Sequence, residues 1–312
     1  MKSFLKLITV FFIVISCTDS QNIQQYSIET LMSNNRSSGG YFSKDADKLI
    51  YSSDKSGIFN IYEVDLSTNE ETQLTDSKEE SFFVRGYSPT TGEVIYSADK
   101  GGNENSHIYL IREGRSIDLT PGENTKASYV GWTNDEQEMY IISNSRDPRF
   151  FDLYKIDIVT LKSEMVFKND SGYNLNSISN NDRYLVLSLN LSRSEQKLFL
   201  YDLKRNQQVE ISNQVANFSG QNFDKNDENY FYTTNYNSEF YYLMSYNLKN
   251  GERRTVYKTN WDVVFSYLSK NNSYRVIAVN EDAQNKITIK NMSDQSNLNL
   301  IGFENMNINS VG

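Results

Sequence analysis

The sequence contains very few of the residues that cross-link chains, bind metals or carry acid–base chemistry. Its 312 residues include one cysteine, one histidine and three prolines. One cysteine cannot form an internal disulfide bond, and one histidine cannot supply a clustered metal site. The scarcity of proline and the 13% share of aromatic residues suit β-strands better than helices or disorder, so we predict an all-β protein without cofactors.

Positive charge is also scarce. The chain has 31 Lys and Arg residues against 40 Asp and Glu residues, which gives a formal net charge of −9. Nucleic acid would be repelled by this charge, and the sequence has no basic cluster that would offset the repulsion. We therefore exclude nucleic acid as a partner, and we interpret the acidity as a feature that keeps an exported protein soluble.

The N-terminus has the layout of an export signal. Lys2 and Lys6 flank the start of an apolar run at residues 4–15, which is too short to span a bilayer comfortably. The run ends just before Ser16 and Cys17. Bacterial lipoprotein signals resemble this arrangement, with the cysteine that receives lipid placed after a small residue.

Lipid attachment at Cys17 is the interpretation that we favour, although Val14 replaces the leucine that is usual in such signals. We predict a lipoprotein-type signal peptide at residues 1–17 and a polar stalk at residues 18–25. Acyl chains would then tether the protein to a periplasmic or surface face of the cell envelope without burying any of its domain in the membrane. The alternative is an ordinary signal peptide with an incidental cysteine.

A unit of about 45 residues recurs along the chain. One turn residue before the second apolar run keeps spacings of 45 or 46 residues, and we call these turn residues the anchors: Ser43, Ser88, Thr133, Ser179, Asp224 and Ser269. The middle of the following run keeps the same spacing, at Tyr51, Tyr96, Ile141, Leu187, Tyr232 and Ile277. Five units end their next run with Asp or Asn, and the second unit alone departs from this pattern, with Arg112-Glu113.

Each unit has room for four strands, and four strands per repeat of this length are typical of a β-propeller. We predict six complete blades and the start of a seventh within residues 26–312. The expected units are 41–81, 82–127, 128–172, 173–217, 218–262 and 263–307. A solenoid of helical pairs has a similar period, but the apolar runs here are short, β-branched or aromatic, and lack helical spacing.

We make one prediction for each end of the propeller. The segment from Tyr26 to Met32 is a candidate for an additional strand that pairs with the last blade. Ser310 to Gly312 fall in the phase of a further inner strand, and a strand left half-built has an unpaired edge. We therefore expect a truncated sequence.

Three stretches carry a resemblance to a known family. They are YFSKDADKLIYSSDKSGIFNIYEVD at 41–65, SADKGGNEN followed by IYL and LTPGE at 97–123, and GWTNDEQEMYIISNSRDPRFFDLYKIDI at 131–158. These stretches resemble the N-terminal β-propeller of the prolyl oligopeptidase family, especially its bacterial dipeptidyl- and acylaminoacyl-peptidase branch. The repeats are also similar to the Tol-system propeller.

The resemblance implies a propeller that caps the active site of an α/β-hydrolase domain and admits peptides to its Ser, Asp and His. No Gly-x-Ser-x-Gly elbow occurs here; the nearest sequences, at 86–90 and 114–118, lack the closing glycine. His107 precedes any plausible hydrolase region, whereas the hydrolase order places His last. We therefore expect no catalytic residue in this chain and no hydrolysis by it alone.

Two arginines are the candidates for substrate contact. Arg146 and Arg149, in a loop of the third unit, could bind a peptide carboxylate through paired hydrogen bonds. The alternative is an Arg–Asp pair that stabilises the loop through Asp147. Lys78-Glu79-Glu80 could bind an amino group, but the segment has the character of an ordinary linker between blades.

Other polar and aromatic residues have structural interpretations. The acidic loop 224–228 lacks the glycine and the glutamate of a calcium loop, and we interpret it as a solvated turn. We expect His107 to be hydrogen-bonded or solvent-exposed. The tyrosines at 51, 62, 96, 109 and 154 are expected to pack in the core.

The sequence supports one leading function and two alternatives. The leading function is a substrate-gating propeller of an exported prolyl oligopeptidase-like serine peptidase that acts on peptides, with the catalytic domain missing from this chain. The first alternative is a free-standing Tol-type lipoprotein that binds a protein partner in the envelope. A sugar- or metal-dependent propeller enzyme would need clustered histidines and carboxylates, which the sequence lacks.

Overall fold

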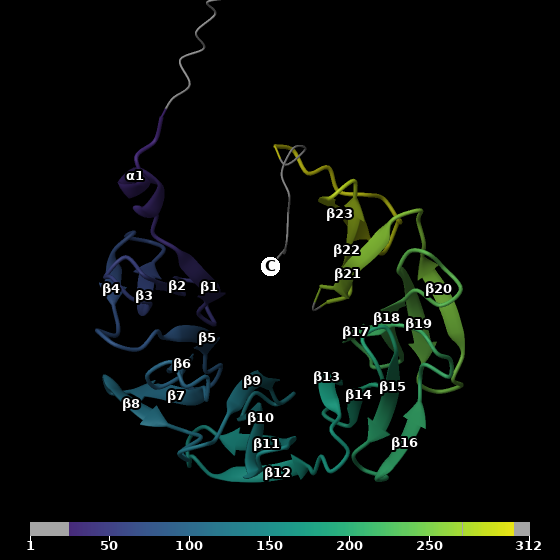
Figure 1. Ribbon diagram of the computed structural model, residues 1–312, viewed down its shortest axis with the longest axis horizontal. Helices are drawn as coiled ribbons and strands as arrows, with labels where there is room; N and C mark the ends of the chain where they lie inside the picture. The colour runs from purple at the N-terminus through teal and green to yellow at the C-terminus, as the bar shows by residue number, and fades with distance from the viewer. Residues whose placement is uncertain (1–24, 270, 303–312) are drawn as a thin grey trace, which may run out of the picture.

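The computed structural model describes residues 25–269 and 271–302, which form six antiparallel sheets that follow one another around an arc (Figure 1). In each sheet the strands lie in chain order, and the first strand faces the centre of the arc. Five sheets have four strands, and the described part of the sixth has three. The prediction of an all-β propeller is confirmed. The residues assigned to a seventh unit, Cys17 and the signal peptide all lie outside the described residues.

The first three blades contain strands β1 to β12. Their bounds are β1 (Ser37–Phe42), β2 (Lys48–Ser53), β3 (Asn60–Asp65) and β4 (Glu71–Gln73); β5 (Phe83–Tyr87), β6 (Val94–Ala98), β7 (His107–Arg112) and β8 (Arg115–Asp118); β9 (Ala127–Trp132), β10 (Glu138–Asp147), β11 (Phe150–Asp157) and β12 (Ser163–Phe167).

The last three blades contain strands β13 to β23. Their bounds are β13 (Asn174–Ile178), β14 (Tyr184–Asn190), β15 (Gln196–Asp202) and β16 (Gln207–Glu210); β17 (Phe218–Phe223), β18 (Asn229–Thr234), β19 (Tyr242–Asn247) and β20 (Arg253–Tyr257); β21 (Asp262–Leu268), β22 (Tyr274–Glu281) and β23 (Gln284–Asn291). Beyond β23, an isolated bridge joins Lys290 to Asn297.

The anchors recur because each of them closes the hairpin between the first two strands of its blade. The backbone N–H of every anchor donates to the carbonyl five residues later, at or just before the start of the second strand, as Ser43 does to Lys48 at 2.9 Å and Ser179 to Tyr184 at 2.8 Å. In several blades the anchor side chain also accepts a backbone N–H from the same turn; Ser179 Oγ accepts that of Tyr184. A short side chain with an oxygen is therefore favoured at this position.

The Asp or Asn that ends the third strand has a similar role in the next turn. Asp65 Oδ1 accepts the backbone N–H groups of Ser67 and Thr68 at 2.9 and 3.0 Å, and Asp157, Asp202 and Asn247 make the equivalent pair of bonds. The second blade needs no such residue because its turn is shorter. Arg112 pairs directly with Arg115, and Glu113 and Gly114 both adopt the left-handed conformation of a two-residue hairpin turn.

The core lies between the blades. Ile50 and Ile61 of the first blade are fully buried against Val84, Val94 and Tyr96 of the second. Equivalent apolar layers join each blade to the next around the arc. In the second to fifth blades, one face of the sheet therefore packs on the blade before it and the other on the blade after it, and we call each interface between consecutive blades a seam.

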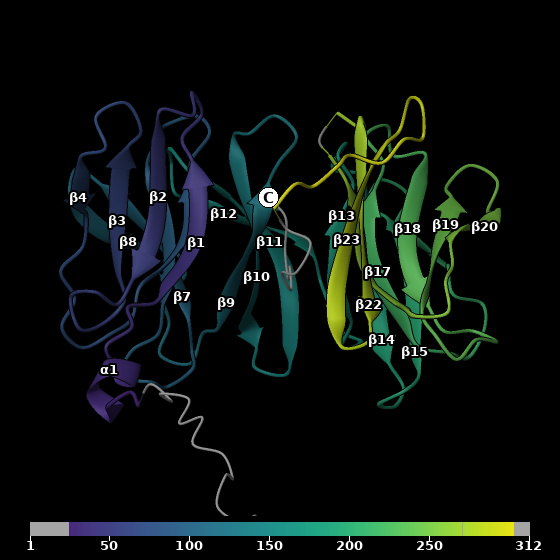
Figure 2. The same cartoon turned by 90° about the horizontal axis from the view of Figure 1, so that it is seen from above.

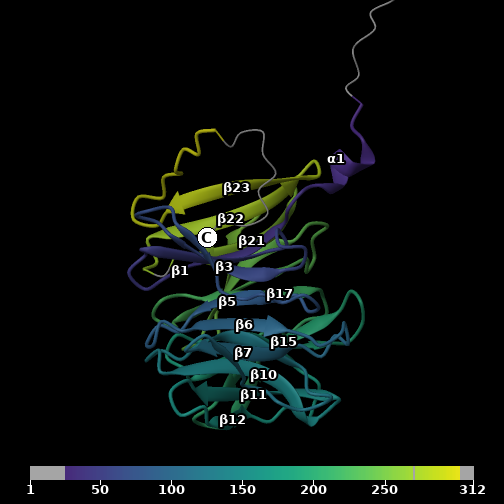
Figure 3. The ribbon, with the colours of Figure 1, turned by 90° about the vertical axis from the view of Figure 1, so that its left-hand side faces the viewer.

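The segment predicted as an additional strand is a helix. α1 (Ile28–Met32) begins after Ser27, whose hydroxyl accepts the Thr30 N–H, and it projects beyond one face of the propeller (Figures 2 and 3). The strand prediction was wrong because this capping bond closes a helical turn locally. In the part of the chain that the structure describes, no helix has the length and apolar character needed to cross a bilayer.

Candidate functional site

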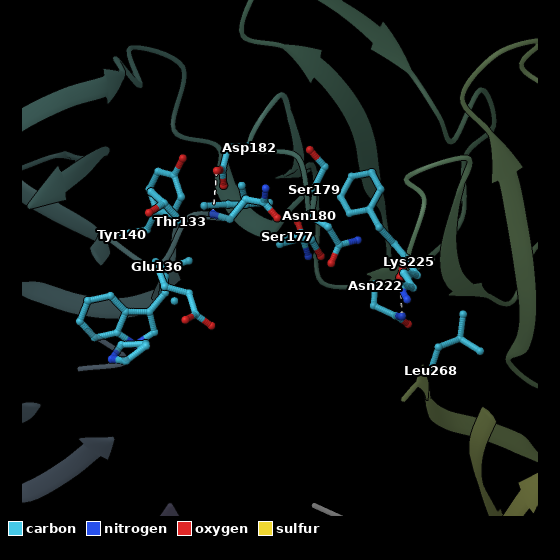
Figure 4. A pocket seen from close by; sticks show the side chains of 18 of the residues that line it. Thr133, Glu136, Tyr140, Ser177, Ser179, Asn180, Asp182, Asn222, Lys225 and Leu268 are labelled. Carbon is cyan, nitrogen blue, oxygen red and sulfur yellow. Dashed lines mark hydrogen bonds between the residues drawn. The ribbon is translucent and has the colours of Figure 1, made fainter. Parts of the chain in front are cut away.

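A large cavity lies at the centre of the arc, where the anchor turns converge. It has a volume of about 770 Å³ and is lined by first strands and anchor turns of the second to sixth blades. Most of its polar lining is neutral, from Asn, Ser and Thr, and its charged residues are Glu136, Asp182 and Lys225. Figure 4 shows these side chains along the wall, with Glu136 extending toward the open centre. We call this space the central cavity.

A second cavity is adjacent to the central cavity. It has a volume of about 690 Å³ and is lined by the fourth, fifth and sixth blades, with amides such as Asn190, Asn217 and Asn280. Asn176, on β13, borders both cavities. Side-chain amides donate and accept hydrogen bonds at once, so this wall is suited to neutral polar ligands that carry both donors and acceptors.

Three hydrogen-bond connections join neighbouring blades at the central cavity, and we call them latches. In each latch the residue after one anchor donates its backbone N–H to a side chain three residues after the next anchor. Asn134 donates to Asp182 at 2.7 Å, Asn180 to Asp227 at 2.9 Å, and Lys225 to Asn272 at 3.1 Å; Figure 4 draws the bond to Asp182.

The accepting residues share a left-handed backbone, with φ of 57° at Asp182, 55° at Asp227 and 58° at Asn272. Asp and Asn tolerate this conformation better than other residues with a Cβ. Asp227 accepts more hydrogen bonds than the other two residues, because its two oxygens also accept bonds from Asn180 Nδ2 at 2.8 Å and from the Asn181 N–H at 2.9 Å. The interpretation of loop 224–228 as a solvated turn was therefore wrong at Asp227, which is only 7% exposed.

Asp182, which lines the central cavity, has a pKa above its usual value. Burial raises its pKa, and the nearby carboxylates of Asp135 and Asp227 act in the same direction. The hydrogen bonds from Asn134 and Tyr140 oppose this shift without cancelling it. Protonation of Asp182 therefore costs less in the folded protein than in the unfolded chain.

The second blade lacks latches on both of its seams. Its anchor turn places the left-handed conformation at Gly92, which has no side chain to reach the first blade. Pro89 has no N–H to donate to Glu136 of the third blade. Lys44 of the first blade contacts the second and third blades instead: its Nζ lies 3.3 Å from the Pro89 carbonyl and 4.0 Å from Glu136, and both charged side chains are more than half exposed.

The two arginines proposed for substrate contact both form ion pairs within the protein. Arg146 makes a bidentate bond to Asp152 at 2.6 and 2.9 Å and also contacts the Asn169 carbonyl. The Asp152 side chain is fully buried, which acts to raise its pKa, but the bonds from Arg146 and Asn169 outweigh burial and hold the pKa below its usual value. Arg149 is 74% exposed and pairs with Asp147. Substrate contact by either residue stays a prediction.

The other residues that the sequence analysis singled out contact neighbouring residues of the protein. His107 Nδ1 lies 2.7 Å from Asp118 Oδ2. Lys78 to Glu80 connect β4 to β5, and Lys78 pairs with Asp76. Tyr62 and Tyr96 are buried, and each stacks on a tyrosine of the neighbouring strand, Tyr51 and Tyr109 respectively. Among residues 25–269 and 271–302, no cluster of three His, Cys, Asp or Glu side chains is arranged to hold a metal ion.

Comparisons with known proteins agree on the family. The family model described as "Prolyl oligopeptidase, N-terminal beta-propeller domain" matches residues 75–311. A curated relative, dipeptidyl aminopeptidase BIII of Pseudoxanthomonas mexicana, is 32% identical over 103 residues, which is 32% of this chain and 14% of that protein.

Solved structures share the fold. A structure from work on two prolyl endopeptidases matches with a TM-score of 0.67 and 13% identity, over 86% of this chain and 43% of that chain. An oligogalacturonate lyase in complex with manganese matches with a TM-score of 0.60 and 15% identity, over 82% and 74%. The chain thus spans less than half the length of the peptidases that it resembles.

Proposed function

This chain belongs to the prolyl oligopeptidase family through its N-terminal β-propeller domain, and from that membership we propose that it is the substrate-gating propeller of an exported serine peptidase. In this role it carries no catalytic residue, and it controls which peptides reach a catalytic α/β-hydrolase domain. The signal-like residues 1–17 and Cys17 would place the protein in the cell envelope on a lipid anchor.

The observation that carries the proposal is the pair of cavities that share Asn176, which we treat as one path; its lining is rich in amides and has four charged residues, Glu136, Asp182, Lys225 and Asp262. An extended peptide presents one N–H and one C=O per residue, and side chains such as Asn176 offer the complementary acceptor and donor. A wall with few charges also discriminates little between peptide sequences. The path is therefore suited to selection by size and extension rather than by side-chain charge.

The proposal is tested first on the gene and on the isolated chain. We expect the reading frame beyond codon 312 to encode a Gly-x-Ser-x-Gly elbow followed by Asp and His. We expect the 312-residue chain alone to release no chromophore from aminoacyl or prolyl substrates. A stop codon directly after Gly312 would favour the free-standing protein-binding propeller, and hydrolysis by the isolated chain would contradict a non-catalytic role.

The gating role is tested in the complete peptidase by narrowing the path. Asn176→Trp places a large ring between the two cavities, while Asn124→Trp, on an exposed turn away from these cavities, is the matched control. We expect Asn176→Trp to lower kcat/KM for an octapeptide about tenfold more than for a dipeptidyl anilide, a difference of about 1.4 kcal/mol in the activation free energy. Equal losses for both substrates would contradict gating at this position.

A further inference from the structure

The helix α1 exposes every large apolar side chain that it carries. Ile28, Leu31 and Met32 are 76%, 59% and 78% exposed, and no residue of the helix is buried. Tyr26, just before the helix, is 56% exposed. Elsewhere among the described residues, exposed large apolar side chains occur singly or in pairs along the chain. Four of them within seven residues form a contiguous patch, and patches of this kind mark contact surfaces. We call it the α1 patch.

The α1 patch is apolar on one side of the helix and carries almost no charge. Ile28, Leu31 and Met32 are spaced by three and four residues, which places them on the same side of a helical turn. Glu29 is the only charged residue of the helix, and the sequence has no Lys or Arg between Lys6 and Arg36. The patch is therefore suited to apolar contact rather than to attraction by an anionic surface.

Polar groups at both ends of α1 are closed by neighbouring side chains. Ser27 Oγ accepts the Thr30 N–H at 3.1 Å at the start of the helix. At its end, Ser33 Oγ and Asn34 Nδ2 donate to the carbonyls of Thr30 and Leu31 at 2.9 and 3.2 Å. Fewer backbone groups then depend on water, which lowers the cost of moving this turn into a drier environment.

The position of α1 on the propeller is fixed through Arg36. The backbone N–H and Nε of Arg36 donate to the two carboxylate oxygens of Asp54 at 2.7 and 2.8 Å, and the Asp54 N–H donates to the Arg36 carbonyl at 3.2 Å. β1 then runs from Ser37 to Phe42, directly before the anchor Ser43. α1 therefore lies at the end of the first blade opposite its anchor turn, and it projects from the propeller there (Figures 2 and 3).

The chain that precedes α1 indicates what covers the patch. Cys17, for which we propose lipid attachment, is eleven residues before Ile28, and eleven extended residues span at most about 40 Å. A lipid on Cys17 would therefore hold α1 close to a bilayer. Apolar side chains on a short helix can insert into the boundary between the headgroups and the acyl chains, where they add to the strength of a lipid anchor.

We propose that α1 inserts Ile28, Leu31 and Met32 into the interfacial region of a lipid bilayer, beside the lipid on Cys17. The proposal rests on the lipid anchor that is part of the proposed function. It also orients the propeller, because α1 and the anchor turn lie at opposite ends of the first blade. The anchor turns, which line the central cavity, then lie on the side away from the membrane.

The first test supplies the anchor artificially, so that it reports on α1 alone. Residues 18–312 retain every described residue and contain no cysteine, so Met32→Cys can carry a single environment-sensitive fluorophore, NBD. An N-terminal histidine tag tethers this chain to phosphatidylcholine vesicles that contain a nickel-chelating lipid. We expect tethering to shift the NBD emission to shorter wavelength, and brominated phosphatidylcholine to quench it. Asp45→Cys, on the exposed anchor turn of the same blade, is the control and should show neither change.

The second test removes the patch. Ile28→Ser combined with Leu31→Ser leaves the core intact, because both side chains are exposed. In the chain labelled at position 32, we expect this pair to lower the ratio of inserted to free label about 100-fold, or about tenfold for each side chain. An unchanged emission shift in this variant, no shift at position 32 on tethering, or equal quenching at position 45 would overturn the proposal.

The same label detects other occupants of the patch. An emission shift without vesicles that grows with protein concentration would assign the patch to a second copy of the chain. A shift without vesicles in the complete peptidase, independent of concentration, would assign it to the catalytic domain. Either result would overturn the membrane contact. Lipid attachment is measured separately, from the mass of the exported protein, and an unmodified Cys17 would contradict the anchor without changing the result for tethered α1.

Discussion

The seams around the central cavity fall into two groups. The three seams from the third blade to the sixth are latched, because an Asp or Asn three residues after one anchor accepts a backbone N–H from the blade before it. The two seams around the second blade lack this bond, because the left-handed position of its anchor turn falls four residues after Ser88, at Gly92, which has no side chain, and because Pro89 has no N–H. A latch therefore needs a suitable donor residue on one blade and a suitable acceptor residue on the next, and a single substitution at either position removes it.

The second blade therefore has no latch on either side. Its seams depend on apolar packing, on the exposed contacts of Lys44, and on bonds away from the anchor turns, such as Val84 N–H to Ser52 Oγ at 2.8 Å and Arg112 to the Ile158 carbonyl at 2.7 Å. Three variants test what a latch contributes.

Asp227→Ala is expected to have the largest effect. It removes three hydrogen bonds to a buried carboxylate and leaves the Asn180 and Asn181 N–H groups without partners, which should lower the free energy of unfolding by about 3 kcal/mol. Glu136→Ala is the matched control, since Glu136 has the same turn position and a similar φ, of 60°, without a backbone partner. Urea unfolding of both variants measures the latch as their difference, and equal losses would show that the latch contributes nothing.

Asp182→Asn is expected to have an intermediate effect that depends on pH. The amide keeps the acceptor for Asn134, as Asn272 does for Lys225, so the loss near pH 7 should stay below about 1 kcal/mol. The raised pKa of Asp182 means that the folded wild type binds a proton before the unfolded chain does. Wild-type stability therefore falls as pH rises from the unfolded pKa of about 4 through the folded pKa.

In Asp182→Asn this part of the pH dependence should be absent. Unfolding free energies of both proteins between about pH 4 and pH 7 provide the check, and the advantage of wild type over the variant should shrink as pH rises. An advantage that grows with pH would show that the charged carboxylate strengthens the latch more than burial weakens it.

Pro89→Ala combined with Glu136→Asp is expected to have the smallest effect. The first change would supply the missing backbone N–H, and the second would give the acceptor the length that it has in the latched seams. Removal of proline costs roughly 0.4–1 kcal/mol through the unfolded chain, so the informative quantity is the coupling between the two changes. We expect about 0.5 kcal/mol of favourable coupling in a double-mutant cycle. Zero coupling would mean that distance, rather than Pro89, prevents a latch here.

The fold was predictable because its signals are local and repeated. The anchors and the Asp or Asn after the third strand bond to their own turns, so their chemistry recurs in sequence at fixed spacing. The departure at Arg112-Glu113 was also visible, and a shorter turn explains it. The helix at Ile28–Met32 was missed because a single capping bond decides that segment.

The site was less predictable because its bonds cross between blades. Asp227 and Asp182 were present in the sequence as polar turn residues, but their partners lie 47 and 48 residues away and are backbone groups without a sequence signal. Arg146 was placed in an Arg–Asp pair, but its main partner is the buried Asp152.

The latches also bear on how the rim of the central cavity can be altered. Because each donor is a main-chain group, the side chains of the donating residues Asn134 and Lys225 are free to vary, and both line the cavity. A combinatorial library randomised at these two positions, with proline alone left out, should keep the propeller intact. Substitutions at these positions can then change which molecules enter the cavity, by design or in evolution, while the main-chain hydrogen bonds between the blades are kept.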